Sequence, residues 1–371
     1  MCQHIEQICY VNGRIRFANF GNNSQTFTIF GGKFSAYMHT HYIKHTFHAV
    51  AVVLVSAMVF TSCTSQNQWR RAQGAAWGTS YHITYYGDRA LDDSVVAVMR
   101  NVELSLSPFE PASNISRINR GETDIADSNV QRVFARAMEI WKYSGGSFDP
   151  TIAPLVNLWG FGTKKGDVLP DSAAVSAALR SVGMGKCSID PHGRITKGHK
   201  DTSFDFSAIT KGYGVDCVAR MLERNGVSDY IVEIGGEIVC RGHNPRGLDW
   251  QVQIDAPVAD SVVTHRRYNV VPLKDAAMAT SGNYRNFRTL PDGRRVGHTI
   301  SPLTGYPRMS STLSATVIAP DCMSADALAT ACMAMDADKA LAMMRALGKG
   351  YSAMLIVDTP QGLQSVSSQD K

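Results

Sequence analysis

Apolar side chains recur every three to four residues in several parts of the chain, as they do along one face of an α-helix. Between residues 126 and 144 they fall at Val130, Val133, Phe134 and Met138, and the repeat stops at a pair of glycines, which is a common helix end. The same spacing predicts further helices over 91–106, 171–182, 211–225, 324–335 and 337–347.

Alternation of apolar and polar residues marks the strands. It predicts strands from 77 to 87 and over 230–234, 250–256, 312–318 and 352–357. Strands and helices do not alternate regularly, as they would around a parallel sheet, and no repeat or linker rich in proline or serine divides them. We therefore expect an α+β domain with mixed sheets and packed helices, built as one body or as two lobes.

The first 62 residues have a different character. Their longest apolar run, 49–60, has twelve residues, whereas a membrane-spanning helix needs about 20. A weakly cationic stretch with Lys44 precedes this run, and Thr61, Ser62 and Cys63 follow it, which is the order of a secretory signal. A buried helix is the alternative. The junction resembles a bacterial lipobox with Cys63 as the lipidated residue, which predicts an exported protein, anchored to a bacterial membrane and facing the periplasm.

A signal peptide normally begins with a short cationic stretch, so Met38 is the better initiation site. The expected division is therefore an N-terminal extension over 1–37, a signal peptide over 38–62, a tether over 63–76, a domain over 77–358 and a polar tail over 359–371.

The composition, 44% hydrophobic and 19% charged, excludes a disordered chain. The net charge of the 371 residues is +5. Residues 1–62 hold four of the basic residues and one of the acidic ones, so the remainder carries only +2. That charge is too small to indicate binding to nucleic acid.

The cysteines after Cys63 show no pairing pattern. They are five in number, without a CxxC motif or a metal-ligand spacing, and they lie in apolar surroundings that favour a role as small core residues. A disulfide between two of them is the alternative. These cysteines are Cys187, Cys217, Cys240, Cys322 and Cys332.

The common nucleotide-binding, hydrolase and zinc-protease motifs are absent from the sequence, and small residues and acids cluster in five places instead. The first cluster is the GSFDP segment, with Ser147, Phe148 and Asp149; it offers close approach to a ligand or is simply a helix end with an Asp-Pro turn. The second runs from Asp205 to Asp216 and places Lys211 in the first turn of a predicted helix. Free amides and a cation there suit a phosphate, and a solvated lysine is the alternative.

The third cluster, Glu233 to Glu237, surrounds a Gly-Gly pair and favours a hairpin over an anion-binding nest. The fourth joins Thr280-Ser281-Gly282 to a segment that begins at His298, a candidate acid or base or a structural histidine.

The fifth cluster pairs Asp326 with Thr330. At a spacing of four in a predicted helix their oxygens share one face, and such oxygens suit Mg²⁺, which takes few protein ligands. An acid that complements the helix dipole is the alternative.

Taken in order, the segments GSFDP, Asp205–Asp216, IGGEI, TSGNYRNF, HTISPLTGYP and ADALATA resemble the ApbE family of FAD:protein FMN transferases, from about Trp77 to Val357. The resemblance implies FAD as the substrate and Mg²⁺ as the cofactor. It implies that Mg²⁺ is bound by Asp326, Thr330 and the carbonyl of Ala208. It also implies an FAD site formed by Trp77, Phe109, Ser147, Phe148, Asp149, Asp205, Lys211, Thr280 and His298. Trp77 and Phe109 stand where members usually carry Met and Tyr.

The resemblance further implies that a Thr or Ser hydroxyl of an acceptor protein attacks the FMN phosphorus and that AMP is released. His298 and Asp326 are the expected catalytic residues, and acceptors in the family include subunits of Rnf/Nqr-type complexes. Two alternatives remain: hydrolysis of FAD to FMN and AMP, and a flavin-binding lipoprotein without turnover.

Overall fold

The computed structural model describes residues 66–162, 169–257, 267–282, 299–308 and 310–370, and the backbone alone of 8–11, 14–17, 287–289 and 295–297. By its contacts the chain divides into two units, Met1–Thr64 and Ser65–Lys371. In the first unit, β1 (Ile8–Val11) pairs antiparallel with β2 (Arg14–Phe17). The predicted signal peptide and Cys63 lie outside the described residues.

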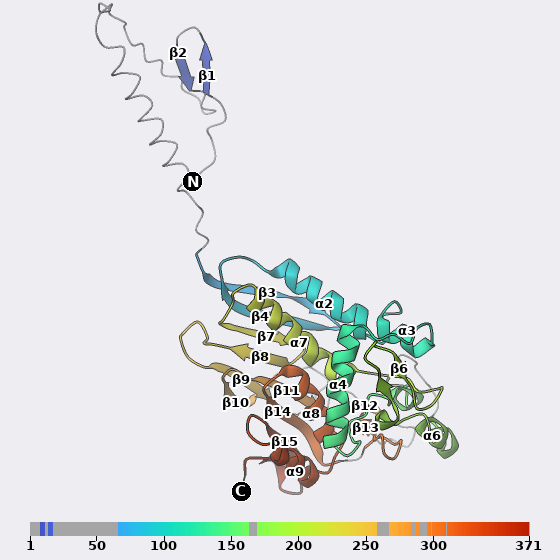
Figure 1. Cartoon of the computed structure of the whole chain (residues 1–371). Helices are drawn as coiled ribbons and strands as arrows, with labels where there is room; N and C mark the ends of the chain where they lie inside the picture. Colours follow the sequence, from blue (N-terminus) through green and yellow to red (C-terminus); the bar gives the residue numbers. More distant parts are fainter. Residues whose placement is uncertain are drawn as a thin grey trace, which may run out of the picture. The chain divides into compact units, whose positions relative to one another are not determined.

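An eight-stranded sheet runs through the second unit in the order β16-β15-β14-β11-β8-β7-β4-β3 (Figure 1). Neighbouring strands pair antiparallel throughout. The strands are β3 (Gln68–Ala76), β4 (Thr79–Gly87), β7 (Tyr230–Ile234), β8 (Glu237–Arg241), β11 (Ala277–Gly282), β14 (Thr312–Ala319), β15 (Ser352–Thr359) and β16 (Gly362–Ser367). Short two-stranded ladders are β5 (Ser188–Ile189) with β6 (Ile195–Thr196), β9 (Trp250–Asp255) with β10 (Arg267–Leu273), and β12 (Phe287–Thr289) with β13 (Arg295–Gly297).

The turn between β7 and β8 shows how the sequence sets the register. Ile234 pairs with Glu237, which leaves Gly235 and Gly236 as a two-residue loop. Both glycines have positive φ, 63° and 96°, as tight hairpin turns with the twist of the strands require. The hairpin that the Gly-Gly pair predicts is therefore confirmed, and it fixes Glu237 at the start of a buried strand.

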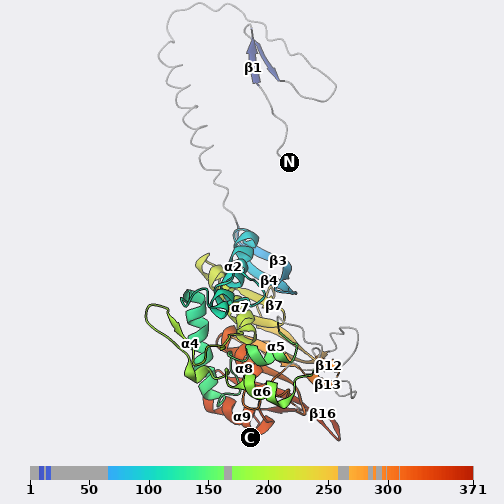
Figure 2. The same ribbon diagram turned by 90° about the vertical axis from the view of Figure 1, so that its right-hand side faces the viewer.

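Helices cover one face of this sheet (Figure 2). Small apolar residues of β11 and β14, such as Ala279 and Val317, join α8 and α7 in the main core. The opposite face carries the β9–β10 hairpin, whose Trp250 and Ile254 pack with Met278. The helices are α2 (Asp92–Leu106), α3 (Asn114–Arg120), α4 (Ser128–Tyr143), α5 (Ala153–Leu158), α6 (Ser172–Leu179), η1 (Met184–Lys186), α7 (Ser207–Arg224), α8 (Cys322–Met333) and α9 (Ala337–Leu347).

The α+β class is confirmed, and the structure corrects both ends of the expected domain. Residues 68–76, expected as part of the tether, form β3, because all nine pair with β4. Residues 362–367, expected in the polar tail, form β16, which pairs along β15. The contacts of Ser65–Lys371 form one unit and not two lobes.

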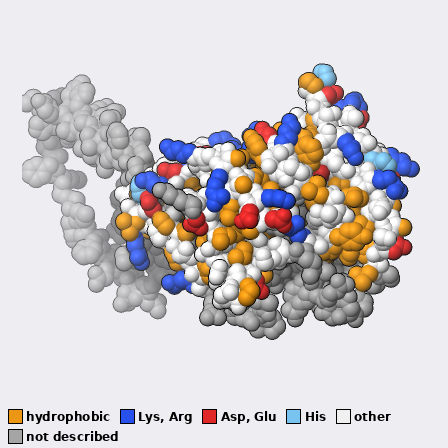
Figure 3. Space-filling view, turned by 90° about the horizontal axis from the view of Figure 1, so that it is seen from below, with side chains coloured by type: hydrophobic (Ala, Val, Ile, Leu, Met, Phe, Trp, Pro, Cys, Tyr) orange, Lys and Arg blue, Asp and Glu red, His pale blue; other side chains and the backbone are white. Residues whose placement is uncertain are grey.

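The five cysteines after Cys63 are free thiols, four of them buried and Cys217 half-buried, which confirms that they serve as small core residues. Among the described residues, none of the helices combines the length and the apolar character that crossing a bilayer requires. Acidic and basic side chains are interspersed over the face seen in Figure 3, in keeping with the small net charge expected of this part of the chain.

Candidate functional site

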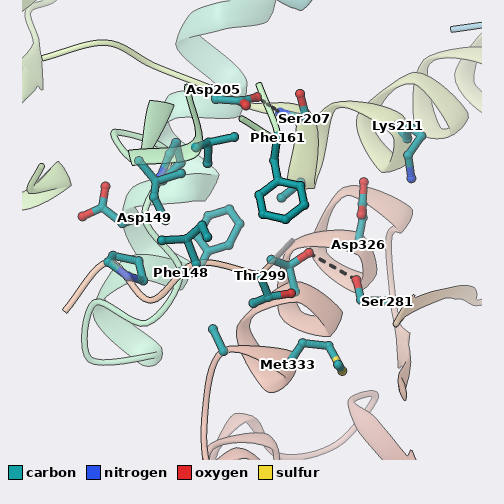
Figure 4. Close-up of a pocket in the computed structure, with 18 of the residues that line it drawn as sticks. Phe148, Asp149, Phe161, Asp205, Ser207, Lys211, Ser281, Thr299, Asp326 and Met333 are labelled. Carbon is teal, nitrogen blue, oxygen red and sulfur yellow. Dashed lines mark hydrogen bonds between the residues drawn. The ribbon is translucent and has the colours of Figure 1, made fainter. Parts of the chain in front are cut away.

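A cavity of about 770 Å³ opens beside the start of α7 and the inner face of α8 (Figure 4). Its volume lies in the range of ligand sites. It brings together ten residues that the sequence predicts for the site: Phe109, Ser147, Phe148, Asp149, Asp205, Ala208, Lys211, Thr280, Asp326 and Thr330.

Helix α8 presents Asp326 and Thr330 to the cavity from successive turns. The helix begins where Asp321 accepts a hydrogen bond from the Ser324 N–H at 2.8 Å, a usual N-cap. Asp326 is 3% exposed, and its Oδ2 accepts the Gly212 N–H of α7 at 2.9 Å. Thr330 Oγ1 lies 3.2 Å from Ser281 Oγ of β11. Both oxygen-bearing side chains are thus held by neighbours on other elements.

Helix α7 starts at Ser207, four residues before the predicted start, because the Phe206 carbonyl accepts the N–H groups of Ile209 and Thr210. The Asp205 carboxylate accepts the Ser207 N–H at 2.8 Å and so stabilises the bend into the helix. Lys211 then lies one turn inside the helix, facing Asp326 (Figure 4).

Glu237 is a lining residue that the sequence reasoning left out of the site. Its side chain is 5% exposed, and its Oε1 forms an ion pair with the Lys211 ammonium. Its Oε2 is buried and has no hydrogen-bond partner within the part of the chain that the structure describes. A glutamate directly after a Gly-Gly turn and at the head of an apolar strand is the signal that could have identified it.

Burial and mutual charge perturb this group of three. Burial, together with the nearby Asp326 charge, raises the pKa of Glu237 to about 7 against the opposing effect of Lys211. Burial likewise raises the pKa of Asp326, opposed by Lys211 and the Gly212 N–H. Burial alone would lower the pKa of Lys211, but the two carboxylates outweigh it and the pKa is raised. Such perturbed groups in a cavity are typical of functional sites.

The residues present fit a hard divalent cation. Among the described residues, Asp326 and Glu237 face the Lys211 ammonium, so these three groups together carry one excess negative charge, and Glu237 Oε2 has no hydrogen-bond partner. In a regular α-helix the Gly212 N–H donates to the Ala208 carbonyl. Here the Gly212 N–H also donates to Asp326. The Ala208 carbonyl oxygen therefore has a lone pair available for a cation. The described residues contain no cluster of three or more His, Cys, Asp or Glu side chains suited to a metal, and Mg²⁺ commonly relies on few protein ligands and on substrate phosphates.

The GSFDP segment forms the opposite wall, but its aspartate has another role. Asp149 Oδ1 accepts the N–H and hydroxyl of Thr151 at 2.9 and 2.5 Å, and Oδ2 accepts the Met184 N–H at 2.9 Å. The carboxylate points away from the cavity (Figure 4), and burial raises its pKa. The segment therefore forms the Asp-Pro turn. The Asp149 carboxylate stabilises this cavity wall through hydrogen bonds on the side away from the cavity.

Apolar side chains complete the cavity. Phe148, which is part of the GSFDP wall, and Phe161 line the cavity, and Met333 closes one end (Figure 4). Phe109 also lines the cavity and is 66% exposed. One part of the cavity thus suits a flat apolar group and another suits an anion with a cation.

One predicted site residue does not line the cavity, and another is not described. The Trp77 ring packs against α7, where a Cβ on Gly214 would come within 2.2 Å of it, and Trp77 is not among the lining residues. Its position in the turn between β3 and β4 turns the ring toward the core. His298 lies outside the described residues.

The sequence of residues 77–355 matches the model of the ApbE family. The chain belongs to the ApbE family. Two relatives are named FAD:protein FMN transferase. The one from Haemophilus influenzae is 32% identical over 332 residues, covering 85% of this chain and 94% of its own. The one from Vibrio cholerae is 32% identical over 327 residues, covering 85% and 96%.

Solved ApbE structures have the same fold. The flavin transferase ApbE from Vibrio cholerae superimposes with a TM-score of 0.73 at 31% identity, over 82% of this chain and 98% of that one. The apo form of the flavinyl transferase ApbE from Pseudomonas stutzeri gives 0.73 and 31%, over 82% and 96%. The family and fold expected from the ordered motifs are thereby confirmed.

Proposed function

We propose that this ApbE-family protein, a transferase by family, moves FMN from FAD to a Thr or Ser hydroxyl of an acceptor protein and releases AMP, with Mg²⁺ as cofactor. The observation that carries the proposal is the convergence of Lys211, Glu237, Asp326 and Thr330 in one cavity that also has an apolar wall. FAD has matching parts, a flat ring system and a charged diphosphate.

Residues on α7 and α8 would receive the diphosphate. The Lys211 ammonium supplies a positive charge. The side chain is 34% exposed and lines the cavity. Asp326, Thr330 and the Ala208 carbonyl would hold Mg²⁺. When bound there, this ion would neutralise charge on the phosphates. Glu237 holds the Lys211 ammonium from behind.

The reaction needs one bond exchange. The acceptor oxygen bonds to the FMN phosphorus, the diphosphate P–O bond breaks, and AMP leaves with the electron pair. The hydroxyl proton must pass to a base, and we propose His298 for this role because it precedes lining residues Thr299 and Ile300 in the chain. The acceptor we propose is a membrane-complex subunit of the Rnf/Nqr type.

We also propose that the protein is exported and anchored through a lipid on Cys63. The support is the apolar run of twelve residues, the small residues before Cys63 and the five-residue distance to β3. Radiolabelled fatty acid should label the wild-type protein in cells and not Cys63→Ser. Equal labelling of both proteins would contradict a lipid anchor on Cys63.

The test of transfer uses purified protein, FAD, Mg²⁺ and a candidate acceptor subunit. Flavin fluorescence that stays on the acceptor in a denaturing gel, with AMP released in equal amount, supports transfer. AMP and FMN without labelling would replace the proposal with hydrolysis, and binding without products would replace it with a flavin-binding role.

A further inference from the structure

Asp216 is a buried carboxylate of α7 that does not line the cavity. It is 6% exposed, and both of its oxygens accept backbone N–H groups, Oδ1 from Cys322 and Oδ2 from Met323, each at 2.9 Å. These two residues begin α8, and N–H groups in the first turn of a helix have no partner inside that helix. Asp216 therefore caps α8 from the neighbouring helix.

Capping alone does not require a residue of another helix. Asp321, the N-cap residue of α8, already accepts the Ser324 N–H at 2.8 Å. A local cap satisfies an N–H group wherever the helix lies. The Asp216 contacts do more, because they tie the first two residues of α8 to one position along α7.

This tie belongs to a row of contacts along one face of α7. Ala208, Gly212 and Asp216 are four residues apart and so share a face. A Cβ on Gly212 would lie 2.2 Å from the Cys322 carbonyl oxygen, so the helices touch there. At the cavity end of the row, Ala208 lines the site with Asp326. The distance between these two ligand groups is therefore set by the contacts at 212 and 216.

We propose that Asp216 is a positioning residue for the divalent-cation site, holding α8 where Asp326 and Thr330 stand opposite the Ala208 carbonyl. It touches neither cation nor substrate. The inference rests on the proposed function, since it concerns the same Mg²⁺ site. Mg²⁺ demands near-octahedral geometry at about 2.0–2.1 Å, and losing an outer partner of a metal ligand typically weakens binding about 10–100-fold.

The experiment measures Mg²⁺ binding itself, by calorimetry on the purified full-length protein without FAD. Asp216→Asn keeps the side-chain shape, but its amide turns an NH₂ toward one of the two N–H groups, which loses its acceptor. Asp321→Ala is the matched control, because it removes a cap from the same helix without touching the tie to α7. Both variants should lower the melting temperature.

We expect the Mg²⁺ dissociation constant to rise at least about tenfold in Asp216→Asn and to stay within about twofold of wild type in Asp321→Ala. FAD turnover of Asp216→Asn should recover at saturating Mg²⁺, because the ligands themselves are intact. An unchanged dissociation constant in Asp216→Asn, or an equal rise in both variants, would overturn the inference and leave a stabilising cap.

A second variant covers the case in which Asp216→Asn does not fold. Cys322→Pro removes one of the two N–H donors at the first helical position, which proline tolerates, and Asp321 already has the extended backbone (φ −136°, ψ 153°) that precedes proline. It should also weaken Mg²⁺ binding, and wild-type affinity would overturn the inference. If the wild-type protein binds no Mg²⁺ either alone or with FAD present, the metal part of the proposed function fails and the inference fails with it.

Discussion

Gly212→Ala tests how closely α7 and α8 must approach. The added Cβ would lie 2.2 Å from the Cys322 carbonyl oxygen, 2.7 Å from its carbon and 2.8 Å from Asp326 Cβ. Two of these neighbours are backbone atoms, which cannot rotate away. Since carbon and oxygen normally stay about 3.3 Å apart, the helices must separate by about 1 Å.

The cost to stability and the cost to function differ in size. Overpacking costs about 1–3 kcal/mol, and the better helix propensity of alanine offsets about 1 kcal/mol of this, so we expect a net loss of up to about 2 kcal/mol. A shift of about 1 Å between reacting groups can lower the rate about 100-fold. Gly212→Ala should therefore stay folded in denaturant titrations, with a much weaker Mg²⁺ affinity and a turnover about 100-fold lower.

Gly214→Ala is the control on the same helix. Its Cβ would lie equally close, 2.2 Å, to the Trp77 ring and away from α8, so stability should fall while the Mg²⁺ dissociation constant stays near that of wild type. The reasoning is refuted if Gly212→Ala binds Mg²⁺ and turns over like wild type, or if Gly214→Ala weakens Mg²⁺ binding as much.

The remaining predictions concern the charges in and behind the cavity walls. Glu237→Gln removes the unbalanced negative charge and should weaken Mg²⁺ binding on the order of tenfold, measured by calorimetry; unchanged affinity would contradict the charge argument. Because burial raises the pKa of Glu237 to about 7, Mg²⁺ must displace a proton below that pH, so affinity in a pH series should fall from pH 7 to 5. Without metal, the same shift stabilises the protonated folded state, so the free energy of unfolding should fall as pH rises from about 4.5 toward 7; the opposite slope would count against it. Asp149→Asn should cost about 1–3 kcal/mol in denaturant unfolding, because three donors depend on this carboxylate, and no loss would show that they are replaceable.

The sequence predicts the helices well where apolar spacing is long and regular. The repeat over 126–144 becomes α4 and the one over 337–347 becomes α9. The edge strands β3 and β16 were missed because edge strands have polar, half-exposed sequences, with mostly exposed positions along both, and only pairing with a neighbour makes them strands.

The site was predictable where all the residues concerned lie in one short segment of the chain. The i, i+4 spacing of Asp326 and Thr330 needs only a helix. Glu237 joins Lys211 across 26 residues, and Asp216 meets Cys322 across 106. No local pattern contains such pairings, which depend on how α7 packs against β8 and α8. For the same reason Asp149 was expected to face a ligand, although its carboxylate is used to hold the chain.

We propose that Asp326 and its neighbours support transfer of FMN from FAD to a protein hydroxyl. The direct measurement is covalent flavin on a purified acceptor, with wild type and Asp326→Ala compared at saturating Mg²⁺. We predict labelling with one AMP released per flavin in the wild type, and neither product in Asp326→Ala. Full labelling by Asp326→Ala would contradict the assigned site, and no labelling by wild type with any flavin-accepting subunit would contradict the transfer itself.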